Sequence, residues 1–231
     1  MTTVPKKLII DIWSDVMCPW CIIGYQKLMA GLEEISDEFE AEIRWRPFEL
    51  NPQMPPEGED AAEHVMRKYG RTPQEAAEGR GKISDIARAA GWPMEYAGGG
   101  KGPPARMWNT FRAHKLLAHA LAGYGPALQT RLKLALFAAH FRERRDVSDC
   151  GVLLDIAEAQ GMDRTRAARA LDDDALGQHV RDDEALAWDM NISGVPAMVV
   201  NGKYLVPGAQ EPETYAAVLR KVAAKEAAAA T

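Results

Sequence analysis

Two cysteines lie two residues apart in the segment Cys18-Pro19-Trp20-Cys21. An apolar run typical of a buried strand, residues 8–13, precedes them, and residues 19–38 follow with the apolar spacing of a helix. Cys18 therefore lies at the first turn of a helix, where unpaired backbone N–H groups and the helix dipole favour the thiolate. Cys21, one turn later, is within reach of a disulfide with Cys18. This arrangement predicts a redox dithiol with Cys18 as the nucleophile and Cys21 as the resolving thiol.

The two residues between the cysteines are expected to tune the site. Pro19 suits the first helical position because it has no N–H to leave unpaired, and Trp20 adds an apolar rim beside the sulfur. The alternative use of such a pair, a zinc site, needs two more ligands at suitable spacing. Cys150 is distant and the five histidines are scattered singly, so no metal site is predicted. Cys150 itself follows Ser148, a plausible helix N-cap; a buried structural thiol is favoured for it over an accessory redox role.

The distribution of periodic segments predicts an α/β protein with an inserted helical domain. Residues 1–52 and 176–231 form the α/β part, and residues 53–175 read as helices separated by turn signals, without a convincing strand. The expected strands are residues 8–13, 41–50, 197–201 and 204–206, and the expected helices include residues 19–38, 106–122, 126–144, 178–190 and 211–230. Asn201-Gly202 is a strong two-residue hairpin turn, and Thr72 with Glu75 forms a capping-box pattern.

Length and charge limit the partners of the chain. A chain of 231 residues with 47% hydrophobic residues can bury a full core, and a formal charge of −5 without a basic run argues against nucleic acid and anionic membrane surfaces. The longest apolar runs fall short of the roughly 20 residues that span a bilayer. The first residues lack a signal-peptide pattern, and three cysteines do not suggest a disulfide framework. We therefore expect a cytoplasmic protein.

Several motifs together resemble the thioredoxin superfamily, in particular its DsbA-like branch and the cytoplasmic FrnE-like disulfide oxidoreductases. Relatives of these proteins are 2-hydroxychromene-2-carboxylate isomerases and kappa-class glutathione transferases. The resemblance covers nearly the whole chain and is carried by residues 14–21, 45–52, 109–114, 193–196, 201–204 and 208–210. It implies a thioredoxin fold with a large α-helical insertion. It also implies that Pro196 is cis and faces the dithiol, so that the backbone of Val195 can pair with a substrate strand.

Further site residues are predicted with alternatives left open. Asn51, where the second strand ends, and His114, on a helix expected to cover the active-site edge, are candidate substrate contacts, although a turn cap and helix packing explain them as well. Glu49 is a further candidate contact. Asp11 or Asp15 could accept the proton of the buried sulfur during exchange, or could be an ordinary strand-end charge.

The function expected from these features is thiol-disulfide exchange with protein or glutathione substrates. No metal or organic cofactor is required, and glutathione is a plausible co-substrate. The alternative is a glutathione-dependent isomerase or transferase of the hydroxychromene-carboxylate isomerase type. Those relatives generally carry serine at the first motif position, where this chain has Cys18, so the dithiol argues against that alternative. Monomer and homodimer are both compatible with the sequence.

Overall fold

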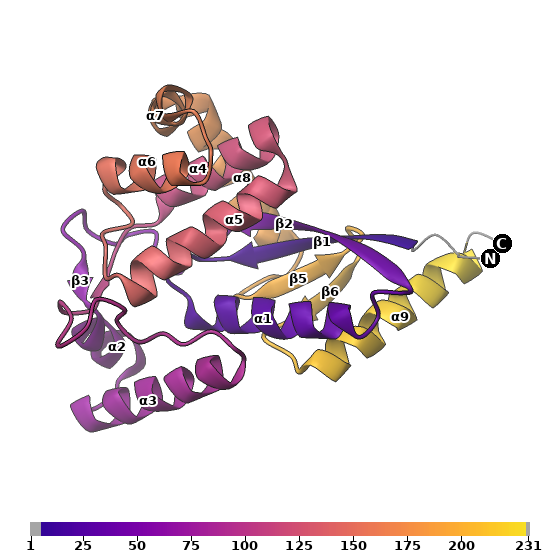
Figure 1. Cartoon of the computed structure of the whole chain (residues 1–231), viewed down its shortest axis with the longest axis horizontal. Helices are drawn as coiled ribbons and strands as arrows, with labels where there is room; N and C mark the ends of the chain where they lie inside the picture. Colours follow the sequence, from indigo (N-terminus) through magenta and orange to yellow (C-terminus); the bar gives the residue numbers. More distant parts are fainter. Residues whose placement is uncertain (1–5, 230–231) are drawn as a thin grey trace.

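A four-stranded mixed sheet is the centre of the computed structural model, which describes residues 6–229 (Figure 1). Its strands are β1 (Lys6–Ser14), β2 (Phe39–Pro47), β5 (Ala197–Val200) and β6 (Tyr204–Pro207), in the order β2-β1-β5-β6. β1 and β2 are parallel, whereas β5 is antiparallel to both β1 and β6. This is the predicted thioredoxin-like arrangement, in which the carboxyl end of β1 leads directly to the dithiol.

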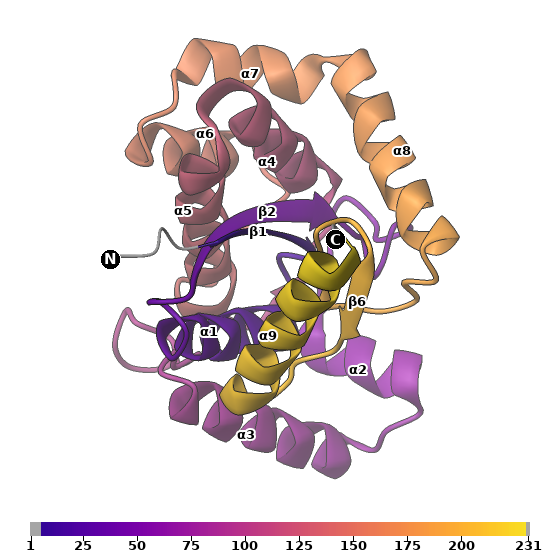
Figure 2. The same ribbon diagram turned by 90° about the vertical axis from the view of Figure 1, so that its right-hand side faces the viewer.

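Helices cover both faces of this sheet. Because side chains alternate along a strand, Leu8, Ile10 and Ile12 of β1 point to one face, where they join a core with α1 (Pro19–Glu33) and α9 (Pro212–Ala229). Trp13 points to the other face, where it packs in a smaller core with α8 (Asp174–Asp189). Figure 2 shows the sheet between these two groups of helices.

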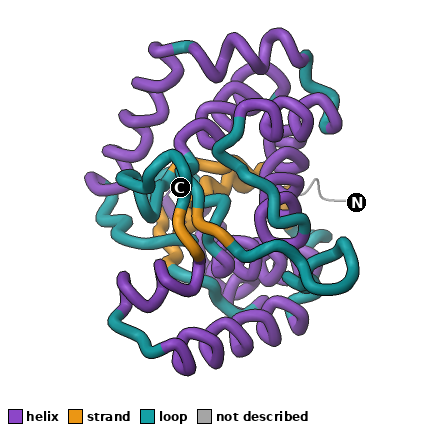
Figure 3. The backbone as a smooth tube through the Cα atoms, turned by 90° about the vertical axis from the view of Figure 1, so that its left-hand side faces the viewer, coloured by secondary structure: helices purple, strands orange, loops and turns teal. Residues whose placement is uncertain are grey.

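The inserted segment is mainly helical, as Figure 3 shows. Its helices are α2 (Ala61–Tyr69), α3 (Pro73–Ala89), α4 (Phe111–Tyr124), α5 (Pro126–Phe137), α6 (Cys150–Ala159) and α7 (Arg164–Asp172), with a π-helical turn η1 (Ala138–Arg142) after α5. The expectation of no strand here is wrong, because β3 (Glu59–Asp60) and β4 (Arg106–Met107) form a short antiparallel pair. Two-residue strands carry no alternating apolar pattern that a sequence could reveal.

Local signals explain where several elements begin and turn. The predicted capping box of α3 is confirmed: the N–H of Glu75 donates to Thr72 Oγ1 over 3.2 Å, and the N–H of Thr72 donates to Glu75 Oε2 over 2.8 Å. The predicted hairpin turn is confirmed as well, with φ of 50° at Asn201 and 68° at Gly202. Both residues therefore occupy the left-handed region that this turn requires.

Some predicted helix boundaries are wrong for identifiable reasons. α1 ends at Glu33 instead of residue 38, because Ile35 turns into the core and the chain must enter β2 at Phe39. α4 begins at Phe111, whose N–H donates to Asn109 Oδ1 over 3.0 Å, because the residues before it pair as β4. α5 ends at Phe137 and continues as the π-helical turn.

Aspartates, which cap helix N-termini well, set two other boundaries. Asp149, and not the predicted Ser148, caps α6 by accepting the N–H of Val152 over 2.8 Å. Asp173 caps α8, which therefore begins four residues before the predicted residue 178.

The insertion and the sheet share their interior. Val16 and Met17, in the loop after β1, belong to the same buried cluster as residues of α4, α5 and α6. Conversely, Phe137 of α5 packs in the core beneath the sheet with both motif cysteines. Residues 6–229 include no helix with the length and apolar character needed to cross a membrane.

Candidate active site

The dithiol lies at the start of α1. Cys18 is the N-cap of the helix, Pro19 begins it, and the N–H of Cys21 donates to the Cys18 carbonyl over 3.1 Å. Both thiols are free and buried, with Cys18 3% and Cys21 0% exposed, whereas Trp20 is 39% exposed beside them. The role of Cys18 as the nucleophile therefore stays a prediction, because both thiols are almost completely buried.

The loop before β5 faces Cys18. The Val195-Pro196 peptide is cis, as the resemblance implied, and the Cys18 thiol lies 3.6 Å from the Val195 carbonyl oxygen, to which it donates. Gly24 of α1 permits this close approach, because a Cβ at that position would lie 3.0 Å from Pro196 Cγ. The backbone of Val195 is therefore held beside the Cys18 sulfur.

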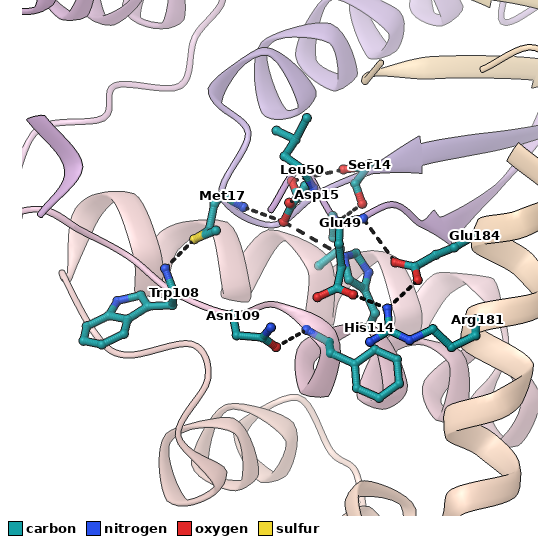
Figure 4. A network of polar contacts seen from close by, with 12 residues as sticks. Ser14, Asp15, Met17, Glu49, Leu50, Trp108, Asn109, His114, Arg181 and Glu184 are labelled. Atoms are coloured by element: carbon teal, nitrogen blue, oxygen red, sulfur yellow. Dashed lines mark hydrogen bonds and ion pairs between the residues drawn. The ribbon is translucent and has the colours of Figure 1, made fainter. Parts of the chain in front are cut away.

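Asp15 is a fully buried carboxylate next to the dithiol. Its Oδ2 accepts the N–H of Leu50 over 2.8 Å, and its Oδ1 accepts the N–H of Met17 over 3.3 Å (Figure 4). Burial raises the pKa of Asp15, while these donors, Lys133 and Thr110 partly offset that effect. A carboxylate whose pKa is raised accepts a proton more readily than an ordinary aspartate, which suits a proton acceptor beside two thiols.

The Lys133 ammonium group is a buried cation whose charge acts on the dithiol. It is 0% exposed, comes from α5, and donates to the Ser14 carbonyl over 3.3 Å. Burial lowers the pKa of Lys133 to about 8, although the negative charge of Cys21, Asp15 and Cys18 acts in the opposite direction. At neutral pH this site therefore places a buried positive charge beside the sulfurs.

The two thiols titrate as a pair that shares a proton. Their mutual hydrogen bond and burial raise the pKa of Cys18. Burial also acts to raise the pKa of Cys21, but the Cys18 thiol, Lys133 and Ser14 outweigh it and lower that pKa. A single negative charge on the pair is thus stabilised, whereas loss of the second proton is opposed.

The structure also shows the surroundings of three other residues considered from the sequence, namely Asp11, Asn51 and Cys150. Asp11 is on the α8 face of the sheet, where its Oδ1 accepts from Arg46 Nε over 2.7 Å, so of the two predicted carboxylates only Asp15 is beside the dithiol. Asn51 is half-buried, and its Oδ1 accepts from Lys68 Nζ over 2.6 Å. Cys150 is the first residue of α6, where Asp149 provides the cap.

His114 is buried behind Asp15 and is only 2% exposed. Its Nε2 lies 4.0 Å from Asp15 Oδ1 and has no hydrogen-bond partner within residues 6–229. Burial and Lys133 lower its pKa well below the ordinary value, so the ring is neutral. His114 also borders a cavity of about 160 Å³ between α4, α8 and β2. The predicted substrate contact at His114 would therefore need a molecule small enough to enter that cavity.

Two acidic side chains share one arginine at the side of Asp15 (Figure 4). Arg181 of α8 forms ion pairs with Glu49 and Glu184, the second over 2.8 Å. Burial raises the pKa of Glu49 to about 7, because Arg181 compensates only in part and Glu184 adds like charge. Glu49 thus lies in a polar network within the protein.

Lys133 is the functional residue that the sequence analysis missed. A signal for it exists: the buried positions of α5 recur as Leu128, Gln129, Leu132, Lys133, Leu136 and Phe137, so the lysine falls within the apolar stripe. No three His, Cys, Asp or Glu side chains lie close enough to hold a metal ion in the part of the chain that the structure describes. The chemistry that this arrangement can perform is nucleophilic attack by a sulfur, assisted by a nearby cation and a buried carboxylate.

Comparison with known proteins gives relatives that match over most of the chain. The structure is similar to the crystal structure of the probable DsbA oxidoreductase SCO1869 from Streptomyces coelicolor, with 28% identity, a TM-score of 0.82, and coverage of 93% of this chain and 89% of the other. YwbO of Bacillus subtilis, described as an uncharacterized protein, is 23% identical over 89% of this chain and 92% of its own.

More distant structures share the fold. A 2-hydroxychromene-2-carboxylate isomerase has 14% identity and a TM-score of 0.65, with 96% of this chain and all of the other covered. The structure of the cytosolic disulfide reductase DsbM from Pseudomonas aeruginosa with GSH has 20% identity and a TM-score of 0.61, with 92% of this chain and 98% of the other covered. The family described as the DSBA-like thioredoxin domain matches residues 9–220. With the thioredoxin-like sheet, the helical insertion and the Cys18–Cys21 pair in place, this chain belongs to the DSBA-like thioredoxin domain family.

Proposed function

We propose that the protein is a FrnE-like thiol-disulfide oxidoreductase that exchanges disulfides with protein or glutathione substrates. The Cys18 thiolate attacks a substrate disulfide, which forms a mixed disulfide and releases one substrate thiolate. Cys21 then attacks the Cys18 sulfur, so that the second substrate sulfur leaves as a thiol and Cys18–Cys21 becomes the disulfide. The reverse sequence oxidises a substrate dithiol. Electrons and protons balance in both directions without a metal or organic cofactor.

The observation that carries this proposal is the 3.6 Å contact between the Cys18 thiol and the Val195 carbonyl oxygen. An extended peptide bound along Val195 would place its own sulfur beside Cys18, as in other cases where a strand adds to an exposed backbone segment. Trp20 and Asn51 are proposed to border the same substrate. Lys133 supports the proposal, since a buried ammonium group stabilises the single negative charge that the pair of thiols carries.

The similarity to SCO1869, described as a probable DsbA oxidoreductase, supports the same class of reaction. We include glutathione and a cytoplasmic location in the proposal; DsbM, a protein of this fold, is described as cytosolic and has been solved with GSH.

The test is the redox equilibrium of the Cys18–Cys21 pair in glutathione buffers, measured on the Cys150→Ser variant so that the third thiol does not interfere. A reversible two-electron transition is expected, and its midpoint gives the direction of exchange. If no intramolecular disulfide forms at any ratio of reduced to oxidised glutathione, the proposal is wrong. Tight binding of an S-alkyl glutathione that survives Cys18→Ser together with Cys21→Ser would then favour a glutathione-dependent isomerase or transferase.

A further inference from the structure

A buried histidine of α4 lies beside the buried carboxylate of Asp15 without bonding to it. His114 is 2% exposed and Asp15 is 0% exposed, and His114 Nε2 lies 4.0 Å from Asp15 Oδ1. That distance is too long for a hydrogen bond. Figure 4 shows both side chains in one network of polar groups. The two groups are therefore neighbours that the interior holds just out of bonding distance.

The atoms that face each other are also the less occupied atoms of the two groups. Asp15 Oδ2 accepts the N–H of Leu50 over 2.8 Å, whereas Oδ1 accepts the N–H of Met17 over the longer distance of 3.3 Å. His114 Nε2 is buried and has no hydrogen-bond partner within residues 6–229. An unpaired polar atom in the interior is costly, so this nitrogen calls for an explanation.

An ion pair does not explain the arrangement, because the His114 ring is neutral. Burial and the positive charges of Lys133 and Arg181 lower the pKa of His114 well below the ordinary value. The Phe48 backbone acts on the ring as a hydrogen-bond acceptor, and since Nε2 has no partner, the ring proton is assigned to Nδ1. Nε2 therefore presents a lone pair to Asp15. A lone pair repels a carboxylate oxygen but accepts a hydrogen bond from a carboxylic acid.

We propose that His114 is a positioning residue for the proton of Asp15, whose Oδ1–H donates to His114 Nε2 whenever Asp15 is protonated. The two atoms need to approach by about 1 Å to form this bond. Because only the neutral acid can make the bond, the bond favours that form over the carboxylate. The 4.0 Å separation is then the arrangement of the ionised form, in which the bond is absent.

The use of this bond rests on the proposed disulfide exchange. In the mixed disulfide, Cys21 transfers its proton to the Asp15 carboxylate, and the Cys21 thiolate attacks the Cys18 sulfur. The substrate thiolate that leaves then takes the proton back from Asp15. The proton that one sulfur loses is thus the proton that the other gains. His114 holds it on Oδ1 between the two transfers, in a part of the site from which Asp15 has no exposure to solvent.

Two other carboxyl groups lie near Asp15 and bear on its protonation. Glu49 and Glu184 both pair with Arg181. Burial is the first cause of the raised pKa of each glutamate, and the charge of Asp15 adds to it. Like charge therefore also favours the protonated form of Asp15. The contribution of His114 has to be measured with Glu49, Glu184, Arg181 and Lys133 all left unchanged.

The test is the pKa of Asp15, measured from its side-chain carboxyl ¹³C signal in the full chain. All samples carry Cys18→Ser and Cys21→Ser, so that no motif thiol titrates in the same range. His114→Phe keeps a ring but removes the acceptor, and it should lower the pKa of Asp15 by about 1, because the acid loses a hydrogen bond. His114→Gln, which retains an acceptor oxygen, should restore at least half of that loss.

A second measurement needs no substitution at His114. The ¹⁵N signal of His114 Nε2 should shift as Asp15 is protonated, with the same midpoint as the Asp15 carboxyl signal. His119→Phe is the matched control, because His119 is also on α4 and also has a buried Nε2 without a partner within residues 6–229. It should leave the pKa of Asp15 unchanged.

Three results would overturn the role of His114. These are a pKa of Asp15 that stays constant or rises in His114→Phe, as added apolar surroundings alone would cause; an equal fall in His119→Phe; and an Nε2 signal that ignores the Asp15 titration. All of these values are obtained without the motif thiols. They therefore stand whether or not Cys18 and Cys21 exchange disulfides, and a failure of the proposed function would be recognised separately in the glutathione equilibrium.

Discussion

At the scale of single residues, the Lys133 ammonium group places a buried positive charge beside the dithiol. Its charge acts on Cys21, Asp15 and Cys18, and it reaches them from a helix of the insertion. A cation beside a thiolate stabilises the reduced form of a dithiol relative to its disulfide. Lys133 is therefore expected to make the pair a stronger oxidant.

Replacing Lys133 by methionine should weaken this effect. The pKa at which the pair loses its first proton should rise by about 1, and the reduction potential should fall by about 30 mV. Thiolate ultraviolet absorbance and glutathione equilibration measure the two quantities. Lys115→Met is the control, because Lys115 is also buried but donates to the Leu171 carbonyl over 2.7 Å. Equal shifts in both variants would contradict a specific role of Lys133.

Glu49 should make stability depend on pH. Its pKa is raised from 4.5 to about 7, first by burial and then by Glu184, so the folded protein binds this proton more tightly than the unfolded chain does. The free energy of unfolding should therefore fall as the pH rises from about 4.5 to about 7.

The variant Glu49→Gln should lose that dependence and exceed the wild type by about 2 kcal/mol at neutral pH, because it no longer has to ionise a buried carboxyl group. Urea unfolding across this pH range measures the difference. Glu57→Gln, at an exposed glutamate, should follow the wild-type curve. A constant offset between Glu49→Gln and wild type at every pH would argue against the raised pKa.

A residue of the site could be predicted when the sequence pattern that identifies it lies within a few neighbouring positions. Cys18, Cys21 and Pro19 form one contiguous motif, and the start of α1 at Cys18 is encoded within a few residues of it. Asp15 was one of two candidates, and only the fold shows that Asp11 instead pairs with Arg46. Lys133 is 112 or more positions away from both cysteines in the sequence, so nothing local connects it to them.

At the scale of elements, α1 depends on glycine where it meets the start of α9. A Cβ at Gly31 would lie 2.5 Å from the Pro212 carbonyl oxygen and 3.1 Å from Tyr215 Cβ. Gly31→Ala should therefore push the two helices apart and lower the free energy of unfolding by about 1–3 kcal/mol. Gly79→Ala in α3, where a Cβ would meet nothing within 4 Å, should instead raise it by about 0.5–1 kcal/mol through helix propensity. Urea unfolding measures both, and the same sign for both variants would refute the packing argument.

Element boundaries were predictable where a side chain fixes them within one turn. The capping box of α3 and the Asn201-Gly202 turn are such cases. The start of α4 was not, because the preceding Arg106 and Met107 pair with β3, almost fifty residues earlier in the chain. The end of α5 was not either, since residues 138–142 contain no Pro or Gly that would mark the change from i→i+4 to i→i+5 hydrogen bonds.

At the scale of the whole molecule, the insertion contributes side chains to the surroundings of the dithiol and covers one edge of the sheet. It supplies Lys133 and His114 to the surroundings of the dithiol, and the N–H of Trp108 donates to Met17 Sδ over 2.9 Å. It also covers the outer edge of β2, where edge strands otherwise expose unpaired backbone groups. Gln129 of α5 accepts the N–H of Trp45 over 2.9 Å and donates to the Trp45 carbonyl over 2.8 Å.

Gln129 should therefore join the insertion and the sheet into one cooperative unit. Its amide is fully buried and also donates to the Leu117 carbonyl over 3.2 Å, so Gln129→Leu leaves the N–H and the carbonyl of Trp45 unpaired and removes the additional bond to the Leu117 carbonyl. The free energy of unfolding should fall by about 3 kcal/mol, whereas Gln74→Leu on the exposed face of α3 should change it by less than about 0.5 kcal/mol. Urea unfolding followed by far-ultraviolet circular dichroism and by tryptophan fluorescence should give coincident transitions in the wild type. Two separate transitions would mean that the insertion unfolds independently, and that the dithiol could lose Lys133 while the sheet stays folded.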